Sequence, residues 1–363
     1  MTLGVILAIG ESLSDLKSKG QLARLLDYNI KHYAKNFDEV FIFSYANEKN
    51  FILPKNCRLI TNTLGLNRYL YSILMPIINR NEFTKCSVLR GLQLSGGIPA
   101  AVARIIYSKK FVINYGYDYS EFAKIEGKPI QSFLYKIIEI PIIRLASSVI
   151  VTAVEIKKEL ESQIKISKIR FIANGVDIAL FKKIKSQDTK QLTVMYIGRL
   201  EKQKNLENLV KALADLKDVK AILYGQGSLR NKLKSQARKL KVNLTIKDPI
   251  EYQKIPRALS LADVFVLPSL EEGNPKILLE AMSCQKAVIG SNVKGIKEII
   301  TNNYNGLLAV TDSQSIARAI KKLENRSLRE RLGENARKYI IENYEINKLL
   351  GREVTLIKKM ATR

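Results

Sequence analysis

The stretch VFVLPSLEEGNPKILLEAMSC, residues Val264 to Cys284, decides the fold that we predict for this chain. It opens with a short apolar run, Val264–Leu267, whose length is typical of a buried strand. A polar turn follows, and a helical pattern begins at Pro275, since proline suits the first helical position, where its missing N–H would be unpaired anyway. Asn274 stands where a capping side chain belongs. A strand, a turn and a helix in this order predict one unit of a parallel α/β sheet.

The turn of this stretch also predicts an anion site. Gly273 lets the backbone approach a ligand closely, and a helix N-terminus directs N–H groups and the positive end of its dipole at an anion. Two carboxylates frame the turn: Glu272 precedes the helix, and Glu280 shares one helix face with Lys276, four positions earlier. A solvated loop with a surface Glu–Lys pair is the alternative interpretation.

Strand-like and helix-like segments alternate along the whole chain, which predicts parallel sheets that are covered on both faces and bind ligands beyond the carboxyl ends of their strands. Helical patterns include Lys17–Lys35, Pro129–Leu145 and Lys297–Ile300. The polar segment 174–191 is typical of a linker. We therefore predict two doubly wound domains, residues 1–185 and 190–345, followed by a helical tail, 346–363.

Composition excludes several classes of protein. Three scattered cysteines among 363 residues do not form a disulfide framework, which favours a reducing cytoplasm. The first residues, MTLGVILAI, have no basic leader and are typical of a first strand, and no apolar run approaches the roughly 18 residues that a membrane span needs. The single histidine, His32, excludes a His-rich metal site.

The net charge of +26 favours an anionic partner, which could be a nucleotide, a nucleic acid or a membrane surface. The basic residues are spread along the chain without a recognition motif, which argues against nucleic acid. The segment Arg68–Arg80 carries apolar residues at helical spacing with an arginine at each end, which is typical of a membrane-surface helix. A core helix is the alternative, since Pro76 should kink or end it.

A second motif, YIGRLEKQKN, opens the second predicted domain. Gly198 ends a strand, and Arg199 and Lys204 follow it. A guanidinium offers a planar fork for two phosphate oxygens, and an ammonium offers a mobile point charge. The two motifs together therefore predict a phosphate-binding site at one sheet edge.

EGNPKILLEAM resembles the Glu-x7-Glu signature of the retaining family 4 glycosyltransferases (glycosyl transferases group 1), which have the GT-B fold. YIGRLEKQKN resembles the G-R-L-x-x-x-K-N element of the same family. The resemblance implies that Arg199 and Lys204 clamp the donor diphosphate, that Glu272 contacts the donor sugar and that Glu280 binds the ribose. The family usually has an aromatic residue or glycine where this chain has Asn274.

The resemblance also implies weaker correspondences. The loop NYGYDY offers Asp118 as the carboxylate where many relatives have His-Asp, and Gly20 matches one glycine of a pair that touches donor and acceptor. The implied catalytic residues are Glu272, Arg199, Lys204 and Asp118. The implied donor-binding residues are Gly198, Arg199, Lys204, Ile250, Gly273, Asn274, Pro275, Lys276, Glu280 and Gly20.

The resulting prediction is a GT-B enzyme of the EC 2.4 class, of hexosyltransferase type, that moves a sugar from a nucleoside-diphosphate sugar to a hydroxyl acceptor, with retention. The acceptor is a glycan or lipid-linked saccharide, no cofactor or metal is needed, and the last helix, 346–363, crosses back to the first domain. We expect a cytoplasmic enzyme that can lie at an anionic membrane surface. The alternatives are a basic nucleic-acid-binding protein and a non-catalytic relative that binds sugar nucleotides.

Overall fold

The computed structural model describes residues 1–116, 118–164, 168–184 and 191–362, and it divides into two compact units. The first consists of Met1–Ser120, Pro129–Ile172 and Lys348–Arg363, and the second of Glu121–Lys128 and Ala173–Asn347. Residues 185 and 190, which limit the predicted domains, lie outside the described residues, as do residue 363 and the middle of the NYGYDY loop, residue 117.

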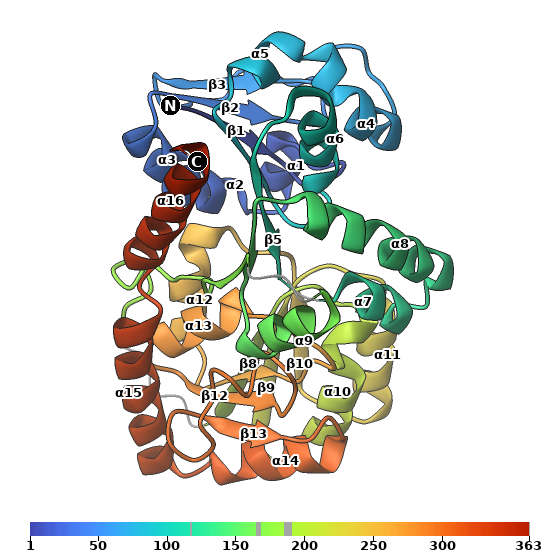
Figure 1. The fold of residues 1–363 in the computed structure, drawn as a ribbon. Coiled ribbons are helices and arrows are strands. Elements are labelled where there is room, and N and C mark those ends of the chain that lie inside the picture. The colour runs from blue at the N-terminus through green and yellow to red at the C-terminus, as the bar shows by residue number, and fades with distance from the viewer. Residues whose placement is uncertain (117, 165–167, 185–190, 363) are drawn as a thin grey trace. The chain divides into compact units, whose positions relative to one another are not determined.

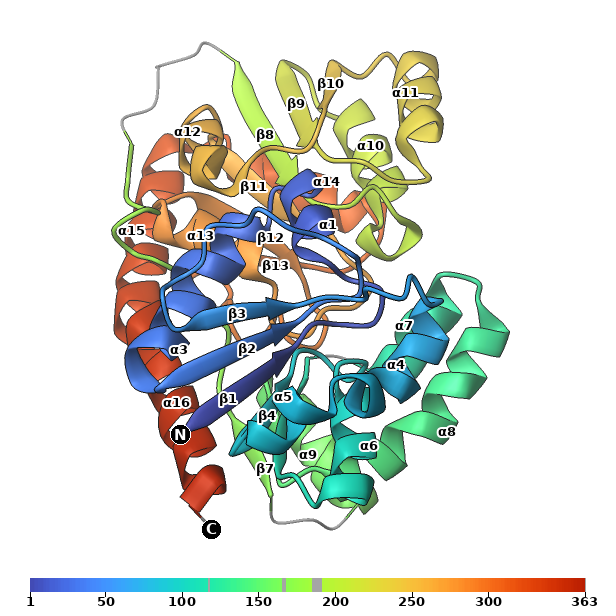
Figure 2. The ribbon, with the colours of Figure 1, turned by 90° about the horizontal axis from the view of Figure 1, so that it is seen from above.

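The first unit contains a sheet of seven parallel strands in the order β3-β2-β1-β4-β5-β6-β7. Figure 2 shows β1, β2 and β3 side by side, running in the same direction. The strands are β1 (Thr2–Ile6), β2 (Glu39–Phe43), β3 (Cys57–Ile60), β4 (Val88–Gly91), β5 (Phe111–Tyr115), β6 (Ser148–Val151) and β7 (Ile169–Phe171). The chain adds β2 and β3 on one side of β1 and then returns to its other side with β4, so the topological switch point lies between β1 and β4.

Helices cover both faces of this sheet (Figure 1). They are α1 (Leu13–Ser18), α2 (Leu22–Arg24), η1 (Leu25–Ile30), α3 (Lys31–Asn36), α4 (Arg68–Ile78), α5 (Arg80–Lys85), α6 (Gly97–Tyr107), α8 (Pro129–Leu145), α9 (Val154–Ile164) and α16 (Ile346–Thr362); α7 (Tyr119–Ile125) runs into the second unit. The predicted helix Lys17–Lys35 is interrupted, because Gly20 adopts φ 67° after α1, and a π-helical turn, η1, follows.

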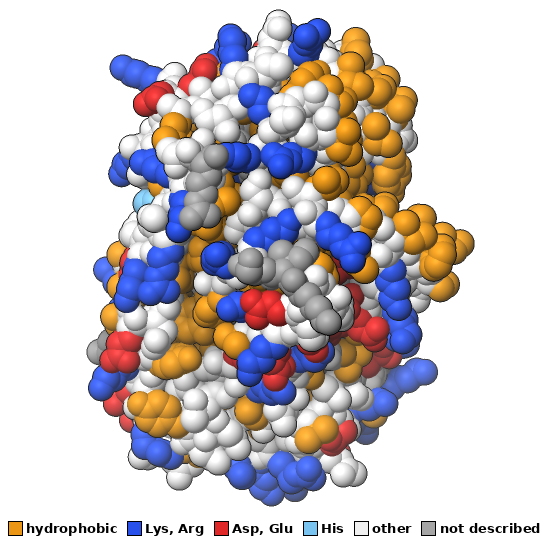
Figure 3. All heavy atoms as spheres, in the orientation of Figure 1, with side chains coloured by type: hydrophobic (Ala, Val, Ile, Leu, Met, Phe, Trp, Pro, Cys, Tyr) orange, Lys and Arg blue, Asp and Glu red, His pale blue; other side chains and the backbone are white. Residues whose placement is uncertain are grey.

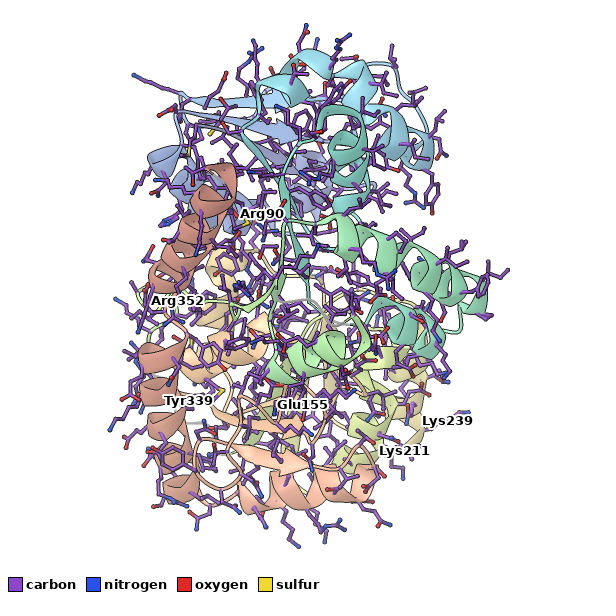
Figure 4. All side chains as sticks on the ribbon, in the orientation of Figure 1. Arg90, Glu155, Lys211, Lys239, Tyr339 and Arg352 are labelled. Atoms are coloured by element: carbon purple, nitrogen blue, oxygen red, sulfur yellow. The ribbon has the colours of Figure 1, made fainter. Side chains whose placement is uncertain are left out.

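A buried charge network attaches α16 to the first sheet. Arg90 of β4, labelled in Figure 4, is 1% exposed, and its Nε donates to Oε1 of Glu353 at 2.7 Å. The Tyr33 hydroxyl donates to the same oxygen at 2.5 Å, while a second Arg90 nitrogen donates to the carbonyl of Gly91. A buried arginine needs such partners because desolvation of an unpaired charge is very costly. The network therefore fixes the chain's last helix to its fourth strand.

The second unit contains six parallel strands in the order β10-β9-β8-β11-β12-β13. The strands are β8 (Leu192–Ile197), β9 (Val219–Tyr224), β10 (Leu244–Lys247), β11 (Val264–Leu267), β12 (Ala287–Ser291) and β13 (Leu307–Ala309). The helices are η2 (Lys202–Lys204), α10 (Leu206–Ala214), α11 (Arg230–Lys239), η3 (Tyr252–Lys254), α12 (Ile255–Ser260), α13 (Lys276–Ser283), α14 (Ser313–Lys322) and α15 (Arg326–Asn343). The prediction of two doubly wound α/β sheets is confirmed.

Two smaller expectations can be compared with this structure. Lys297–Ile300 forms turns instead of a helix, because Ile296, Ile299 and Ile300 are drawn into the core by a compact hydrogen-bonded loop. The three cysteines are buried and free, as expected. Within the part of the chain that the structure describes, no helix has the length and apolar character to span a membrane.

Candidate functional site

The two motifs meet at the switch point of the second sheet. The chain goes from β8 to β9 and β10 on one side, and β11 then pairs with the other side of β8, with Val264 opposite Val194. The loop after β8 carries Arg199 and Lys204, and the loop after β11 carries Glu272 and Gly273. Because both strands are parallel, their carboxyl ends open at the same edge, where doubly wound sheets bind ligands.

An ion pair joins the two loops. Nζ of Lys204 lies 2.5 Å from Oε1 of Glu272, and the two side chains are only 13% and 11% exposed. The Ser269 hydroxyl donates to the same carboxylate oxygen at 2.8 Å. A pair this sheltered from water is held more tightly than a surface pair. The geometry therefore places Lys204, the predicted diphosphate contact, beside Glu272, the predicted sugar contact.

Gln203 holds the same two loops together through its backbone and its amide. Its side-chain nitrogen donates to the carbonyl of Glu271 at 2.6 Å, and its own carbonyl accepts from the N–H of Leu270 at 2.8 Å. Its side-chain oxygen accepts from the exposed guanidinium of Arg199 at 3.4 Å. Since Gln203 is itself buried, the position of Arg199 depends on a fixed neighbour.

Side-chain hydrogen bonds fix the backbone of the loop after β8 at Arg199 and Asn205. The hydroxyl of Tyr196 donates to the carbonyl of Arg199 at 2.7 Å, and burial raises the pKa of that tyrosine well above its ordinary value. Asn205 lies in the left-handed region with φ 56°, and its amide donates to the carbonyls of Pro268 and Thr311. The loop after β8 is thus tied at both ends.

The start of α13 differs from the prediction by one residue. The helix begins at Lys276, and Pro275 is its N-cap instead of its first helical residue. The predicted cap by Asn274 is wrong, because the Asn274 side-chain oxygen accepts from the backbone N–H of Asn174 at 3.0 Å. The Asn174 amide in turn donates to the carbonyl of Asn274 at 2.7 Å. Asn274 therefore joins Asn174, at the start of the polar segment, to the turn before α13.

Lys276 and Glu280 have different environments although they share one helix. Lys276 is exposed in the first turn of α13, whereas Glu280 is 2% exposed one turn later. A buried carboxylate is retained only where a partner or a ligand compensates for its desolvation. Ile250 is half-buried in the loop after β10, at the carboxyl end of another strand of this sheet.

Glycines bring neighbouring loops into backbone contact behind the site. A Cβ on Gly295, whose φ is 72°, would lie 1.7 Å from the carbonyl oxygen of Gly273 and 2.6 Å from that of Glu272. A Cβ on Gly225 would lie 1.9 Å from the carbonyl oxygen of Gly198. Both turns of the site are therefore supported by a glycine from another loop.

Asp118 and Gly20 belong to the first unit. Asp118 is exposed after β5, and Gly20 ends α1, beyond the loop that directly follows β1. The glycine within that loop is Gly10, which packs against the side chain of Arg68. The pKa of the Glu139 carboxyl is raised to about 7. Burial is the largest cause, the charge of Asp118 adds to it, and a hydrogen bond from Tyr115 partly opposes it.

Sequence reasoning missed Gln203, Ser269, Asn174 and Gly295 as parts of this site. Gln203 lies between Arg199 and Lys204, so its place in the same turn was a usable signal. Asn174 is 100 positions from its partner Asn274, and nothing in the local sequence indicates that pairing. Among the described residues, no group of three or more His, Cys, Asp and Glu side chains could hold a metal ion.

Comparison with known proteins gives the family. The profile of the glycosyl transferases group 1 family matches residues 177–339. An uncharacterized glycosyltransferase of Methanocaldococcus jannaschii is 31% identical over 265 residues, which cover 68% of this chain and 67% of the relative. The chain belongs to the glycosyl transferases group 1 family. As a member of this family it is a glycosyltransferase, of the EC 2.4 class.

A curated enzyme and a solved structure are also similar to this chain. The UDP-Gal:alpha-D-GlcNAc-diphosphoundecaprenol alpha-1,3-galactosyltransferase of Escherichia coli is 28% identical, over 51% of this chain and 52% of that protein. Several of the other curated relatives are likewise matched over about half of their length. The structure of Anabaena HepE in complex with UDP and glucose has a TM-score of 0.75 at 17% identity, covering 99% of this chain and all of the other. The group 1 chain therefore has the GT-B fold.

Proposed function

We propose that the protein transfers a sugar from a UDP-sugar to a hydroxyl of a lipid-linked saccharide, with retention at the anomeric carbon. The observation that carries the proposal is the sheltered pair of Lys204 and Glu272 beside the first turn of α13. Two similar proteins support the choice of a UDP-sugar donor and a lipid-linked acceptor. One relative is a UDP-galactose transferase for a diphosphoundecaprenol-linked acceptor, and a structural neighbour holds UDP and glucose.

In this mechanism the diphosphate leaving group acquires negative charge as the bond to the sugar breaks. The Lys204 ammonium, the Arg199 guanidinium and the N–H groups at the start of α13 stabilise that charge. Gly273 is the residue at which the backbone comes closest to the phosphates. These cationic and N–H groups are held in place before the UDP-sugar binds. Little reorganisation is therefore needed at the moment of reaction.

Glu272 and Glu280 divide the rest of the donor between them. Glu272 accepts hydrogen bonds from hydroxyl groups of the sugar while it stays paired with Lys204, and Glu280 accepts hydrogen bonds from the ribose hydroxyls. The half-buried Ile250 contacts the base through its backbone, and Asp118, Gly20 and the acceptor are assigned to the first unit. The proposed chemistry requires no metal.

Isothermal titration calorimetry with UDP and with a panel of UDP-sugars tests this division. Glu280→Gln should weaken the binding of UDP and UDP-sugar alike, because both carry the ribose. Glu272→Gln should leave UDP binding intact and lower sugar transfer. Glu207→Gln, which removes the ion-pair partner of the exposed Lys232, is the matched control and should change neither.

Equal losses of UDP affinity in the two site variants would refute the division of roles. Absence of stabilisation by every UDP-sugar in a thermal melt would refute the proposed donor class, since a ligand that binds the folded state must raise its stability. Turnover that a chelator abolishes would contradict the metal-free chemistry.

A further inference from the structure

The first unit displays an unusual apolar surface on three helices. Side chains of large apolar residues are exposed at helical spacing along α4, α6 and α8, and Figure 3 shows hydrophobic side chains gathered over these helices at the right of the view. The exposed residues are Tyr69, Leu70, Ile73, Ile77 and Ile78 on α4, Ile105 and Ile106 on α6, and Ile130, Phe133, Leu134, Ile137, Ile138 and Ile140 on α8. We call this surface the α4–α6–α8 face.

The three helices form one continuous layer. The Tyr107 hydroxyl at the end of α6 donates to the carbonyl of Pro76 in α4 at 3.3 Å. A Cβ on Gly97, at the start of α6, would lie 2.8 Å from Ile142 of α8. The order across the layer is therefore α4, α6, α8. Contiguous apolar patches of this extent are rare on monomeric proteins and mark a surface that something else covers.

Helix α8 illustrates how the layer is built. Glu139, Ile142 and Ile143 face inward and are buried, whereas Phe133 and Ile137, on the opposite side, are 64% and 53% exposed. The helix thus has apolar residues both inward and outward. An ordinary surface helix would place charged residues outward, so the outward apolar residues need an explanation that folding of the unit does not supply.

The charged residues of the α4–α6–α8 face indicate what covers it. Glu139 is the only acidic residue in α4, α6 and α8, and it is buried, so the layer exposes no carboxylate. Exposed basic side chains border the layer instead: Arg68, Arg80, Lys136 and Arg144. An apolar face with a basic border and without acidic groups is the complement of a bilayer with anionic headgroups.

We propose that the α4–α6–α8 face docks on an anionic lipid bilayer, with the apolar side chains in the headgroup–acyl boundary and the basic border on the lipid phosphates. Because α4 follows β3 and α6 follows β4, both helices begin at the carboxyl edge of the first sheet. Docking therefore brings that edge close to the membrane surface. The proposal deepens the proposed function by naming where a lipid-linked acceptor is met, but it does not depend on catalysis.

Sedimentation with vesicles tests the docking directly. Wild-type protein should bind vesicles of equal parts phosphatidylglycerol and phosphatidylcholine, and bind much less to phosphatidylcholine alone or in high salt. The double variant Phe133→Ser/Ile137→Ser should bind roughly 10- to 100-fold more weakly. Each of Lys136→Gln and Arg144→Gln should weaken binding about fivefold. Val310→Ser/Ile341→Ser removes two exposed apolar side chains of the second unit and should bind as wild type does.

Calorimetry with UDP and a thermal melt accompany each variant. Retained UDP affinity with lost vesicle binding supports the proposal even if the sugar or acceptor is assigned wrongly. Vesicle binding that is absent in the wild type, indifferent to lipid charge, or equally lost in the control variant overturns it. A dimer in light scattering that the Phe133→Ser/Ile137→Ser variant converts to a monomer also overturns it, because the face would then bind a second copy of the chain.

Discussion

Two helices that begin at the switch points of the two sheets have differently capped N-termini: α1 follows β1 in the first unit, and α13 follows β11 in the second. In the first unit, the carboxylate of Glu48 accepts the N–H groups of Leu13 and Ser14 at the start of α1, both at 2.9 Å. In the second unit, α13 starts at Lys276, its N-cap Pro275 offers no capping side chain, and Glu272 in the preceding turn pairs with Lys204 instead. A carboxylate of its own unit therefore caps α1, whereas the start of α13 has no side-chain cap.

This difference supports the proposal that the diphosphate of the donor binds in the second unit. A helix that already carries a buried carboxylate at its N-terminus repels a second anion. A helix end with glycine before it and cations nearby attracts one. The comparison can be tested by altering each end separately, and the variants below run from the largest expected effect to the smallest.

Gly295→Ala should have the largest effect, because its Cβ would collide with the carbonyls of Gly273 and Glu272. We expect UDP affinity to fall more than about 100-fold and stability to drop by about 2–4 kcal/mol. Gly65→Ala is the matched control, since Gly65 has φ 62° but an added Cβ would meet no atom within 4 Å. It should cost about 1–2 kcal/mol and leave UDP affinity unchanged in calorimetry. Normal UDP binding by Gly295→Ala would show that the turn does not shape the site.

Arg199→Ala and Lys204→Ala should each lower kcat/KM roughly 10- to 150-fold, because a charge-assisted phosphate contact contributes about 1.5–3 kcal/mol. Steady-state transfer assays measure the loss. Lys232→Ala removes the exposed lysine that pairs with Glu207 at 2.7 Å and should leave the rate unchanged. Rates within twofold of wild type in both site variants would remove these residues from the mechanism.

Glu48→Ala should lower the free energy of unfolding by about 1–2 kcal/mol, since it leaves the N–H groups of α1 and the hydroxyl of Ser44 without their acceptor. Urea denaturation measures this loss. UDP affinity should stay within twofold of wild type. A tenfold change in that affinity would break the contrast between the two helix ends.

Glu139→Gln should have the smallest effect, and one that depends on pH. The raised pKa of about 7 means that the folded protein binds a proton more tightly than the unfolded chain does. Stability from this group is therefore present at low pH and is lost as pH rises through 7. The substitution should stabilise by about 1 kcal/mol at pH 8 and by little at pH 5. Denaturation curves with equal shifts at both values would contradict the raised pKa.

The sequence predicts the sheets and the two motif loops well, because local patterns encode them. The run Val264–Leu267 is a buried strand in the structure, and Arg199, Lys204 and Glu272 each follow a strand at the switch point. Spacing along the chain carries that information directly. The roles assigned to these residues remain predictions that the variants above address.

Other features depend on partners that are distant in sequence. Asn274 is not a helix cap because Asn174 engages its side chain, and Gly295 matters because another loop's carbonyls lie against it. Pattern also cannot say which apolar face of a helix is buried. Arg68–Arg80 is compatible with a core helix on sequence alone, whereas Ile73 and Ile77 are 53% and 51% exposed.

The ion pair between Arg90 and Glu353 has a consequence for synthesis of the chain. The two residues are 263 positions apart, which a ribosome takes roughly 13 to 50 seconds to cover. Throughout that interval Arg90 has no Glu353 to pair with, so its strand cannot enter the finished core without an uncompensated buried charge. The first unit is therefore completed only after the second has emerged, and a fragment that stops before α16 should be a substrate for chaperones and proteases.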